Sequence, residues 1–152
     1  MHKEYYSYER FRDDTKELIK QQKDFKPEAI VGIARGGLTL AHAMAEGLEI
    51  REVQSIRTEL YDDAQKRDKI ALFGECNFSK VSRVLVVDDI ADSGETLKEV
   101  MQYLKNEFKN IEFQSATLYY KKTSVYKPHF WINGAHTWIE FFWEKDFLLD
   151  EA

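Results

Sequence analysis

The sequence contains one cysteine, Cys76, among its 152 residues, so no disulfide can form within the chain. A chain without disulfides is typical of a reducing compartment, and we expect a cytoplasmic location. No stretch reaches the roughly 18 apolar residues that a membrane-spanning helix needs. The first residues also lack the apolar core of a signal peptide. We therefore expect no integral membrane segment.

Basic runs are also absent, and the formal net charge is −5. Nucleic-acid binding depends on Lys and Arg side chains that neutralise phosphates, so we expect no nucleic-acid partner. The Gly-rich pattern of the P-loop does not occur either. A chain of 152 residues has the length of one domain, and we predict a single domain over residues 1–152.

Strand and helix patterns alternate along the chain. We expect strands over residues 29–34, 52–56, 84–87 and 113–120. We expect helices over residues 7–24, 38–48 and 95–108, the first capped by Ser7. This alternation predicts an α/β fold with a mostly parallel central sheet flanked by helices. The polar stretch 57–70 is predicted to be a mobile loop.

An acidic pair follows the most apolar of these strands. Residues 84–87 are apolar at every position, as in a central parallel strand, and Asp88 and Asp89 come next. Because strand side chains alternate, the two carboxylates should point to opposite sides. The carboxyl ends of strands are where open α/β sheets bind ligands. Two carboxylates there suit sugar hydroxyls or a hydrated Mg²⁺.

A phosphate site is predicted at the start of the next helix. Free N–H groups and the positive end of the helix dipole attract anions, and Gly94 permits a sharp turn. Ser93 and Thr96 add hydroxyl donors. An ordinary turn with an N-cap would use similar residues. However, turn chemistry does not call for the three carboxylates of Asp88, Asp89 and Asp92.

The whole string from Val84 to Thr96 resembles the signature of type I phosphoribosyltransferases, which bind phosphoribosyl pyrophosphate. The resemblance implies that Asp88 and Asp89 hold the ribose hydroxyls, partly through Mg²⁺. It also implies that the 5′-phosphate is bound by Ala91, Asp92, Ser93, Gly94, Glu95 and Thr96. The implied fold has a small C-terminal hood formed mainly by about residues 121–152, with a contribution from the N-terminus.

A second anion-binding loop follows the strand over 29–34. Arg35, Gly36 and Gly37 offer a charged donor and backbone N–H groups that can face an anion. Tight strand-to-helix turns also use glycine pairs routinely. In the resembling family this loop binds pyrophosphate through residues that match Arg35 and Gly36. It often contains a non-proline cis peptide, which we expect at Ala34–Arg35 or one bond later.

The polar stretch 57–70 fits the family's flexible loop, which closes over the pyrophosphate. Lys66, Arg67 or Lys69 can then reach the departing negative charge. A solvated surface loop is the alternative for each of these residues, and Tyr61 is ambiguous in the same way.

The last predicted strand leads to Lys121 and Lys122, at the same sheet edge as Asp88. Lysine only donates hydrogen bonds, so at the purine 6-position it favours an oxo group over an amino group. Trp138 can stack on a flat ring, and the backbone near Ile139 can contact the other edge of the base. The alternative for Trp138 is a buried core position.

The segments 119–123, 127–129 and 137–144 are similar to the hood of bacterial xanthine-guanine phosphoribosyltransferases. The resemblance implies that Lys121 recognises the 6-oxo group, that Trp138 stacks on the base and that Ile139 contacts it through the backbone. Glu144 falls where the family often has an acidic residue near the Mg²⁺ or the 2-substituent.

The expected activity is Mg²⁺-dependent transfer of the 5-phosphoribosyl group from phosphoribosyl pyrophosphate to xanthine, guanine or hypoxanthine in purine salvage. Asp92 can accept the proton from N7 as N9 bonds to the ribose, although it can instead be a structural turn residue. Family members commonly form dimers or tetramers, so we expect a homo-oligomer.

Three alternatives remain open at the level of sequence. A receiver domain also uses an acidic pair and a late Lys, but it usually has the pair near its beginning and lacks the Asp-Ser-Gly string. A regulatory relative can keep the fold and bind RNA. A transferase for another base, such as a pyrimidine, is the nearest rival.

Overall fold

The computed structural model describes residues 2–62 and 68–150. Its strands are β1 (Lys3–Tyr6), β2 (Ala29–Ala34), β3 (Glu52–Asp62), β4 (Asp68–Phe73), β5 (Arg83–Ala91), β6 (Glu112–Tyr120), β7 (Phe130–Gly134) and β8 (Trp138–Phe141). Its helices are α1 (Tyr8–Lys20), the 3-10 helix η1 (Gln21–Lys23), α2 (Leu38–Leu48), α3 (Glu95–Glu107) and α4 (Phe142–Lys145).

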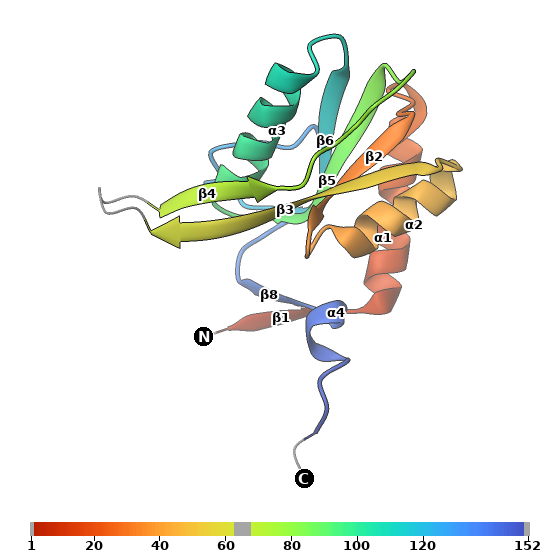
Figure 1. Ribbon diagram of the computed structural model, residues 1–152. Coiled ribbons are helices and arrows are strands. Elements are labelled where there is room, and N and C mark those ends of the chain that lie inside the picture. Colours follow the sequence, from red (N-terminus) through yellow and green to blue (C-terminus); the bar gives the residue numbers. More distant parts are fainter. Residues whose placement is uncertain (1, 63–67, 151–152) are drawn as a thin grey trace.

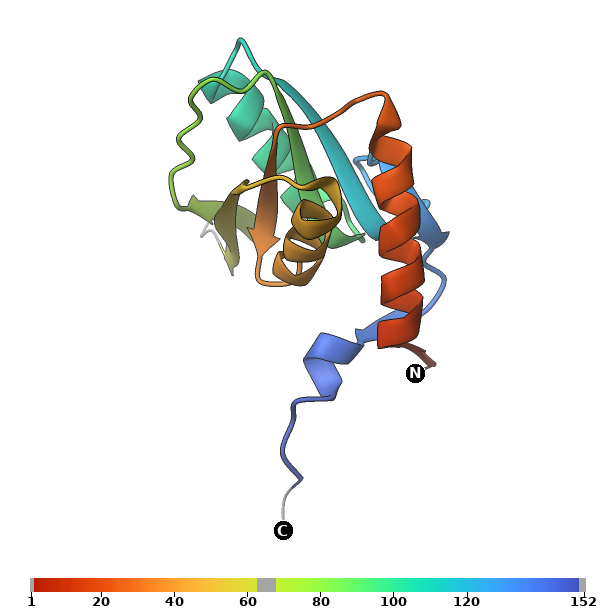
Figure 2. The same cartoon turned by 90° about the vertical axis from the view of Figure 1, so that its right-hand side faces the viewer.

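A six-stranded sheet in the order β4-β3-β2-β5-β6-β7 forms the centre of the molecule (Figure 1). Its neighbouring strands run parallel except for the antiparallel pair β3 and β4. Helices α1 and α2 cover one face and α3 covers the other (Figures 1 and 2). The prediction of an α/β fold with a mostly parallel sheet is confirmed.

Strand β5 shows how the apolar run specifies the centre of the sheet. Leu85 and Val87 pack in the core beneath α1 and α2, whereas Val84 and Val86 pack in the core beneath α3. All four side chains are fully buried. Because both faces of this strand are covered, its apolar run does not alternate with polar residues.

The predicted helices agree closely with the observed ones. The side chain of Ser7 caps α1 by accepting a hydrogen bond from the N–H of Arg10 at 3.1 Å. Helix α1 ends at Lys20, and η1 continues the helical path to Lys23, close to the predicted end. Helix α2 has the predicted bounds, and α3 ends one residue before the predicted Phe108.

The prediction of a mobile loop over residues 57–70 is wrong for the residues that the structure describes. Strand β3 continues to Asp62 and pairs with β4, so residues 57–62 and 68–70 belong to a β-hairpin. The Arg57 guanidinium lies 4.2 Å from the centre of the Phe73 ring across this pair. An edge hairpin exposed to water tolerates a polar sequence, so polarity alone did not distinguish it from a loop.

The strand predicted over 84–87 is also longer than expected. Strand β5 runs to Ala91, and its pairing with β6 continues through Asp88 opposite Thr117 and Ala91 opposite Tyr120. Backbone hydrogen bonding is indifferent to side-chain charge, so the acidic residues remain within the strand.

A separate two-stranded sheet lies beyond the end of the main sheet. It joins β1, from the N-terminus, in parallel with β8, and α4 follows β8 directly (Figures 1 and 2). We call this pair of strands with α4 the hood. Strands β1, β7 and β8 were not predicted as strands, because their short segments have no clear period. In the described part of the chain, no helix is long and apolar enough to cross a membrane.

Candidate active site

Three cavities meet around the acidic pair at the end of β5. The hood pocket, about 410 Å³, is lined by residues that include Asp89, Asp92, Lys121, His136, Trp138 and Glu144. The loop pocket, about 830 Å³, is lined by residues that include Arg35, Gly36, Thr58, Asp88, Asp89 and Thr96. The helix pocket, about 230 Å³, is lined by residues that include Asp88, Asp89, Asp92, Ser93, Gly94 and Thr96. Asp89 borders all three cavities.

The two residues of the pair are half-buried and share two of the three cavities. Asp89 borders the hood pocket as well as the loop and helix pockets, which Asp88 also borders. This difference agrees with the alternation of side chains along β5. The N–H of Asp89 donates to Oδ1 of Asp88 at 2.8 Å, so the strand holds the first carboxylate in a defined orientation.

Electrostatics make this pair costly to ionise in the free protein. Burial, and then the neighbouring charge of Asp89, raise the pKa of Asp88 well above its usual range. Burial also raises the pKa of Asp89, and the nearby Glu144 carboxylate adds to the rise. A cation or several hydroxyl donors would relieve this repulsion. The site therefore has the charge expected of a cation and sugar site.

The loop after β2 lies directly against the acidic pair. A Cβ atom on Gly36 would come within 2.3 Å of Asp89 Oδ2, so only glycine permits this approach. The peptide bond Ala34–Arg35 is cis, as predicted. The predicted anion loop and the predicted acidic pair are thus brought together, with Arg35 lining the loop pocket between them.

The turn that leads into α3 forms the helix pocket. Gly94 has a φ of +84°, and a Cβ atom there would lie 2.1 Å from Ser124 Oγ. The N–H of Val125 donates to the carbonyl of Ser93 at 2.8 Å, which holds the turn against the segment after β6. Because this hydrogen bond holds the turn in place, the first N–H groups of α3 can face the cavity.

The other predicted phosphate residues lie in different positions around this turn. Ala91 lines the helix pocket, and its carbonyl accepts from the N–H of Lys121 at 2.9 Å. Ser93 and Thr96 line the helix pocket and also a neighbouring cavity of about 730 Å³ beneath the hairpin. Glu95 lines only the second of these two cavities. Glu95 therefore shares a cavity with Ser93 and Thr96 but does not line the helix pocket with the other five predicted phosphate residues.

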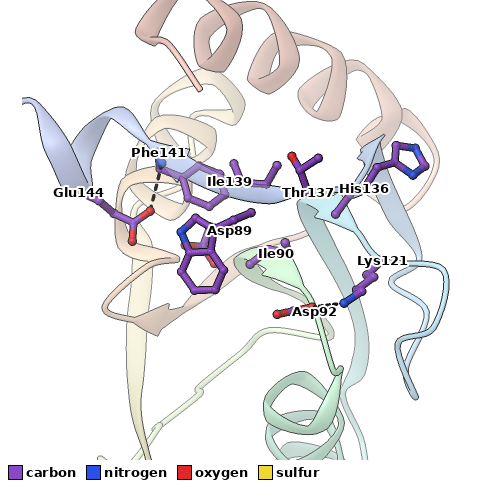
Figure 3. Close-up of a pocket in the computed structure, with 11 residues that line it drawn as sticks. Asp89, Ile90, Asp92, Lys121, His136, Thr137, Ile139, Phe141 and Glu144 are labelled. Atoms are coloured by element: carbon purple, nitrogen blue, oxygen red, sulfur yellow. Dashed lines mark hydrogen bonds and ion pairs between the residues drawn. The ribbon is translucent and has the colours of Figure 1, made fainter. Parts of the chain in front are cut away.

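Lys121 and Asp92 are neighbours in the lining of the hood pocket, with their charged ends toward one another (Figure 3). Lys121 Nζ lies 3.5 Å from Asp92 Oδ1. Both side chains are about half exposed, so this ion pair adds little to stability. A ligand can therefore exchange contacts with either group at small cost.

Trp138 lines the hood pocket and is 57% exposed, so the alternative of a buried core position is wrong for this residue. Ile139, the next residue, is buried and packs in the core, which leaves its backbone at the pocket. Glu144 accepts a hydrogen bond from the N–H of Phe141 at 3.0 Å and lines both the hood and loop pockets (Figure 3).

Tyr61 and Lys69, predicted in the polar stretch, do not line any of these three cavities. Lys66 and Arg67 lie outside the described residues. Tyr61 and Lys69 line the cavity beneath the hairpin, beside Ser93 and Thr96.

The hood pocket also contains residues to which the sequence gave no individual role. Ile90 and His136 line it, and so do Thr137 and Phe141 from the segment 137–144 that resembles the family's hood. His136 and Thr137 come from the connection between β7 and β8, whose position depends on a strand pairing between the two ends of the chain. No local signal marks such residues.

Comparison with known proteins identifies the family to which this chain belongs. The sequence model of the phosphoribosyl transferase domain matches residues 2–148, which is nearly the whole chain. The chain belongs to the phosphoribosyl transferase domain family. Membership in this family excludes the receiver-domain alternative.

Several relatives of this phosphoribosyl transferase domain are similar over most of its length. The xanthine-guanine phosphoribosyltransferase of Idiomarina loihiensis is 28% identical over 142 residues, which cover 91% of this chain and 84% of that protein. The xanthine-guanine phosphoribosyltransferase of Roseobacter denitrificans is 33% identical over 125 residues, which cover 76% and 68%.

Solved structures agree with this assignment. A Helicobacter pylori xanthine-guanine-hypoxanthine phosphoribosyltransferase is 36% identical, has a TM-score of 0.89 and covers 95% of this chain and 96% of its own. A purine phosphoribosyltransferase from Pyrococcus horikoshii is 26% identical, has a TM-score of 0.85 and covers both chains completely. The predicted fold of a type I phosphoribosyltransferase is confirmed.

Proposed function

We propose that this protein transfers the 5-phosphoribosyl group from phosphoribosyl pyrophosphate to a 6-oxopurine base. The observation that carries the proposal is the meeting of three cavities at Asp88 and Asp89. A ribose above these carboxylates would have its 5′-phosphate in the helix pocket and its pyrophosphate in the loop pocket. The hood pocket would then hold the base next to C1.

The lining of the hood pocket supports a 6-oxopurine as the acceptor. Lys121 can donate a hydrogen bond to an exocyclic oxo group, which accepts it, whereas an exocyclic amino group is itself a donor and cannot. The exposed indole of Trp138 offers a face for stacking, and the backbone at Ile139 offers polar groups to the other edge of the base. The names of the similar relatives point to xanthine, guanine and hypoxanthine.

The acidic pair fits a Mg²⁺ ion shared with the substrate. In the described residues, no group of three or more His, Cys, Asp or Glu side chains is arranged to hold a metal ion by protein ligands alone. Mg²⁺ usually binds through one or two carboxylates, several waters and substrate phosphates, which Asp88 and Asp89 can complete. When bound, the ion would supply positive charge near the leaving pyrophosphate.

The chain's own groups can stabilise the charge that develops as pyrophosphate leaves C1. Arg35 and Gly36 line the loop pocket, where that charge would gather, so the guanidinium and the backbone N–H groups of these two residues can face it. The N–H groups at the start of α3 would hold the 5′-phosphate. Because both reactants would be fixed around the same carbon, part of the entropic barrier is removed on binding.

Asp92 is placed to accept a proton from the base. The 6-oxo group and N7 are neighbours on one edge of a purine, and Lys121 and Asp92 are neighbours on one wall of the hood pocket. A base bound with its oxo group at Lys121 would direct N7 toward Asp92. Asp92 would then accept the N7 proton as N9 bonds to C1 of the ribose.

A panel of free bases tests the proposal. The protein is incubated with phosphoribosyl pyrophosphate, Mg²⁺ and one base at a time, and the nucleotide is separated and quantified. Xanthine, guanine or hypoxanthine should be converted to the monophosphate, and adenine, uracil and orotate should not. Conversion of orotate or adenine alone would contradict the proposed acceptor. No product from any base, together with retention of RNA on a filter at low salt, would favour the RNA-binding alternative.

A further inference from the structure

The strand that carries Trp138 and Ile139 is held by the core packing of Ile139 and Phe141 and by one strand partner. In the described part of the chain, β8 pairs with β1 and with no strand of the main sheet. In this pairing Lys3 lies opposite Trp138, and Glu4 lies opposite Ile139. Two strands alone are at best marginally stable in water. The position of Trp138 at the hood pocket, the proposed base site, therefore depends also on what holds β1.

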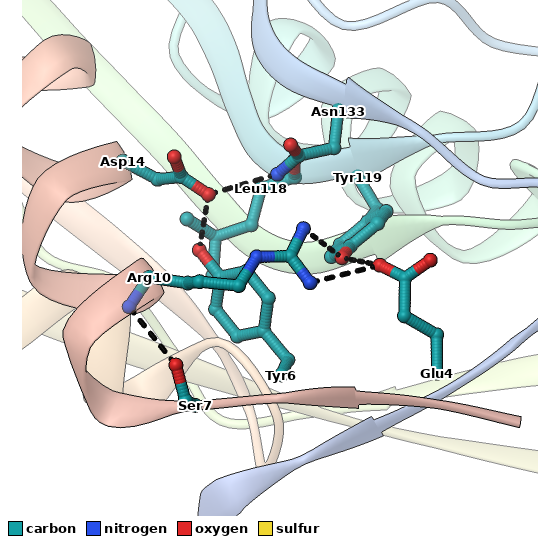
Figure 4. A network of polar contacts seen from close by, with 8 residues as sticks. All are labelled: Glu4, Tyr6, Ser7, Arg10, Asp14, Leu118, Tyr119 and Asn133. Atoms are coloured by element: carbon teal, nitrogen blue, oxygen red, sulfur yellow. Dashed lines mark hydrogen bonds and ion pairs between the residues drawn. The ribbon is translucent and has the colours of Figure 1, made fainter.

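A triangle of side chains ties β1 to the main sheet (Figure 4). Glu4 on β1 accepts a hydrogen bond from Arg10 Nη1 at 3.0 Å and another from the hydroxyl of Tyr119 on β6. Arg10 Nη2 donates to that same hydroxyl at 2.9 Å. The Tyr119 hydroxyl thus both donates and accepts, and the three groups satisfy one another.

A second link runs from the same strand to β7. The Tyr6 hydroxyl donates to Asp14 Oδ2 at 2.6 Å, and Asn133 Nδ2 donates to the same oxygen at 2.9 Å (Figure 4). Asn133 Nδ2 also contacts the carbonyl of Leu118 on β6 at 3.1 Å. Both links therefore reach the main sheet near the residues that precede Lys121.

The charge states match the directions of these hydrogen bonds. The hydrogen bond from Tyr119 and the charge of Arg10 lower the pKa of Glu4, so Glu4 is an ionised acceptor at neutral pH. Burial and the bond to Glu4 raise the pKa of Tyr119, which stays a protonated donor. A hydrogen bond to a charged group is stronger than one between neutral groups.

We propose that Tyr119 is a positioning residue that sets the distance between Lys121 and Trp138 in the hood pocket. Lys121 directly follows the end of the strand that carries Tyr119, and the Tyr119 hydroxyl holds the strand that pairs with Trp138 and Ile139. One buried side chain thereby links the segment that carries Lys121, the proposed hydrogen-bond donor, to the strand that carries Trp138, the proposed stacking residue. The expected effect of Tyr119 on catalysis rests on the proposed function. Its expected effect on the position of the hood rests on geometry alone.

The substitution Tyr119→Phe removes the hydroxyl and keeps the ring, which packs edge-on against Tyr6 and Phe141 at 5.4 and 5.9 Å. Arg10 and Glu4 keep their own ion pair, so no buried charge is left without a partner. The KM for the purine should rise about threefold to tenfold, as expected for one lost hydrogen bond. The kcat and the KM for phosphoribosyl pyrophosphate should change less than about twofold.

Two further variants separate positioning from general destabilisation. Tyr103→Phe makes the same chemical change at a partly buried tyrosine of α3, which packs against the core on the other face of the sheet, and should leave the KM for the purine unchanged. Glu4→Gln keeps an acceptor oxygen but loses the charge, so its KM for the purine should lie between those of wild type and Glu4→Ala, and Glu4→Ala should match Tyr119→Phe. The double variant Glu4→Ala/Tyr119→Phe should be no worse than either single one, because both remove the same link.

Hydrogen exchange supplies a readout that needs no activity. The backbone amides of β1 and β8 should exchange faster in Tyr119→Phe than in wild type, while those of β2 and β5 should not change. Unchanged exchange in β8 would overturn the proposal, as would faster exchange with an unchanged KM for the purine. If wild type converts no 6-oxopurine, the proposed function fails, and the exchange result alone decides whether Tyr119 holds the hood.

Discussion

The phosphate end and the base end of this site are built in different ways. The phosphate end comes from one continuous stretch, β5 and the turn into α3, together with the loop after β2. The base end combines the C-terminal end of β6 with β8, whose strand partner comes from the other end of the chain. Backbone geometry dominates the first region, and side-chain hydrogen bonds hold the second.

Substitutions at the two ends of the site should therefore have different effects. Changes at the phosphate end should act directly on catalysis or on the backbone of the turn, with large effects. Changes at the base end should shift the preference among bases while leaving the handling of phosphoribosyl pyrophosphate intact. The four substitutions below test this division, from the largest expected effect to the smallest.

Asp92→Asn should lower kcat by about 10²-fold or more, because the amide cannot accept the N7 proton. The KM for phosphoribosyl pyrophosphate should change far less, since Asn keeps the size of the side chain. Steady-state kinetics with each substrate varied in turn measure both effects. Equal losses in kcat and in binding would remove the role of Asp92 as a base.

Gly94→Ala should damage the phosphate end through the backbone. A Cβ atom at a φ of +84°, 2.1 Å from Ser124 Oγ, forces the turn or the segment behind it to move. We expect a loss of about 1–3 kcal/mol in the free energy of unfolding and a raised KM for phosphoribosyl pyrophosphate. Urea denaturation and kinetics measure these effects. Gly134→Ala is the control, since its Cβ would meet only the His136 ring, at 3.2 Å.

Lys121→Ala should narrow the preference for hypoxanthine over adenine by about tenfold, because the donor that opposes a 6-amino group is lost. The ratio of kcat/KM values for the two bases measures this change. Lys122→Ala changes the adjacent exposed lysine and should leave the ratio as it is. An unchanged ratio in the Lys121 variant would place this side chain outside base recognition.

Asp88→Asn should stabilise the free protein while it impairs the enzyme. The pKa of Asp88 in the folded state is raised by burial and by Asp89, so its ionised form opposes folding. Wild type therefore loses stability as the pH rises from the unfolded-state pKa of about 3.9 through the raised folded-state value. The variant should gain about 1 kcal/mol over wild type at neutral pH.

Urea denaturation of both proteins without substrate, at about pH 3 and pH 7, measures this gain. Below the unfolded-state pKa of about 3.9 both forms are neutral, so the advantage should vanish there. The Asn oxygen can still accept from the N–H of residue 89, so that contact is kept. A gain independent of pH would show that charge repulsion is not its cause.

Local patterns were enough to predict the elements that flank the phosphate end. The apolar run before Asp88 predicted a buried strand, and the Asp-Ser-Gly string predicted the turn before α3. The same patterns did not show that β5 continues through the acidic pair, because that depends on pairing with β6. The polar hairpin was mistaken for a loop, because antiparallel pairing at an exposed edge needs no apolar alternation.

The sequence by itself determined the order of the four central strands and the three long helices, the acidic pair and the glycines of both turns. These features depend on neighbours within a few residues, so they can be read along the chain. Only the tertiary structure decided that Asp89 borders three cavities, that Trp138 faces one of them, and that Tyr119 reaches Glu4. Such contacts join residues far apart in the chain, and side-chain packing between the sheet and the hood determines them.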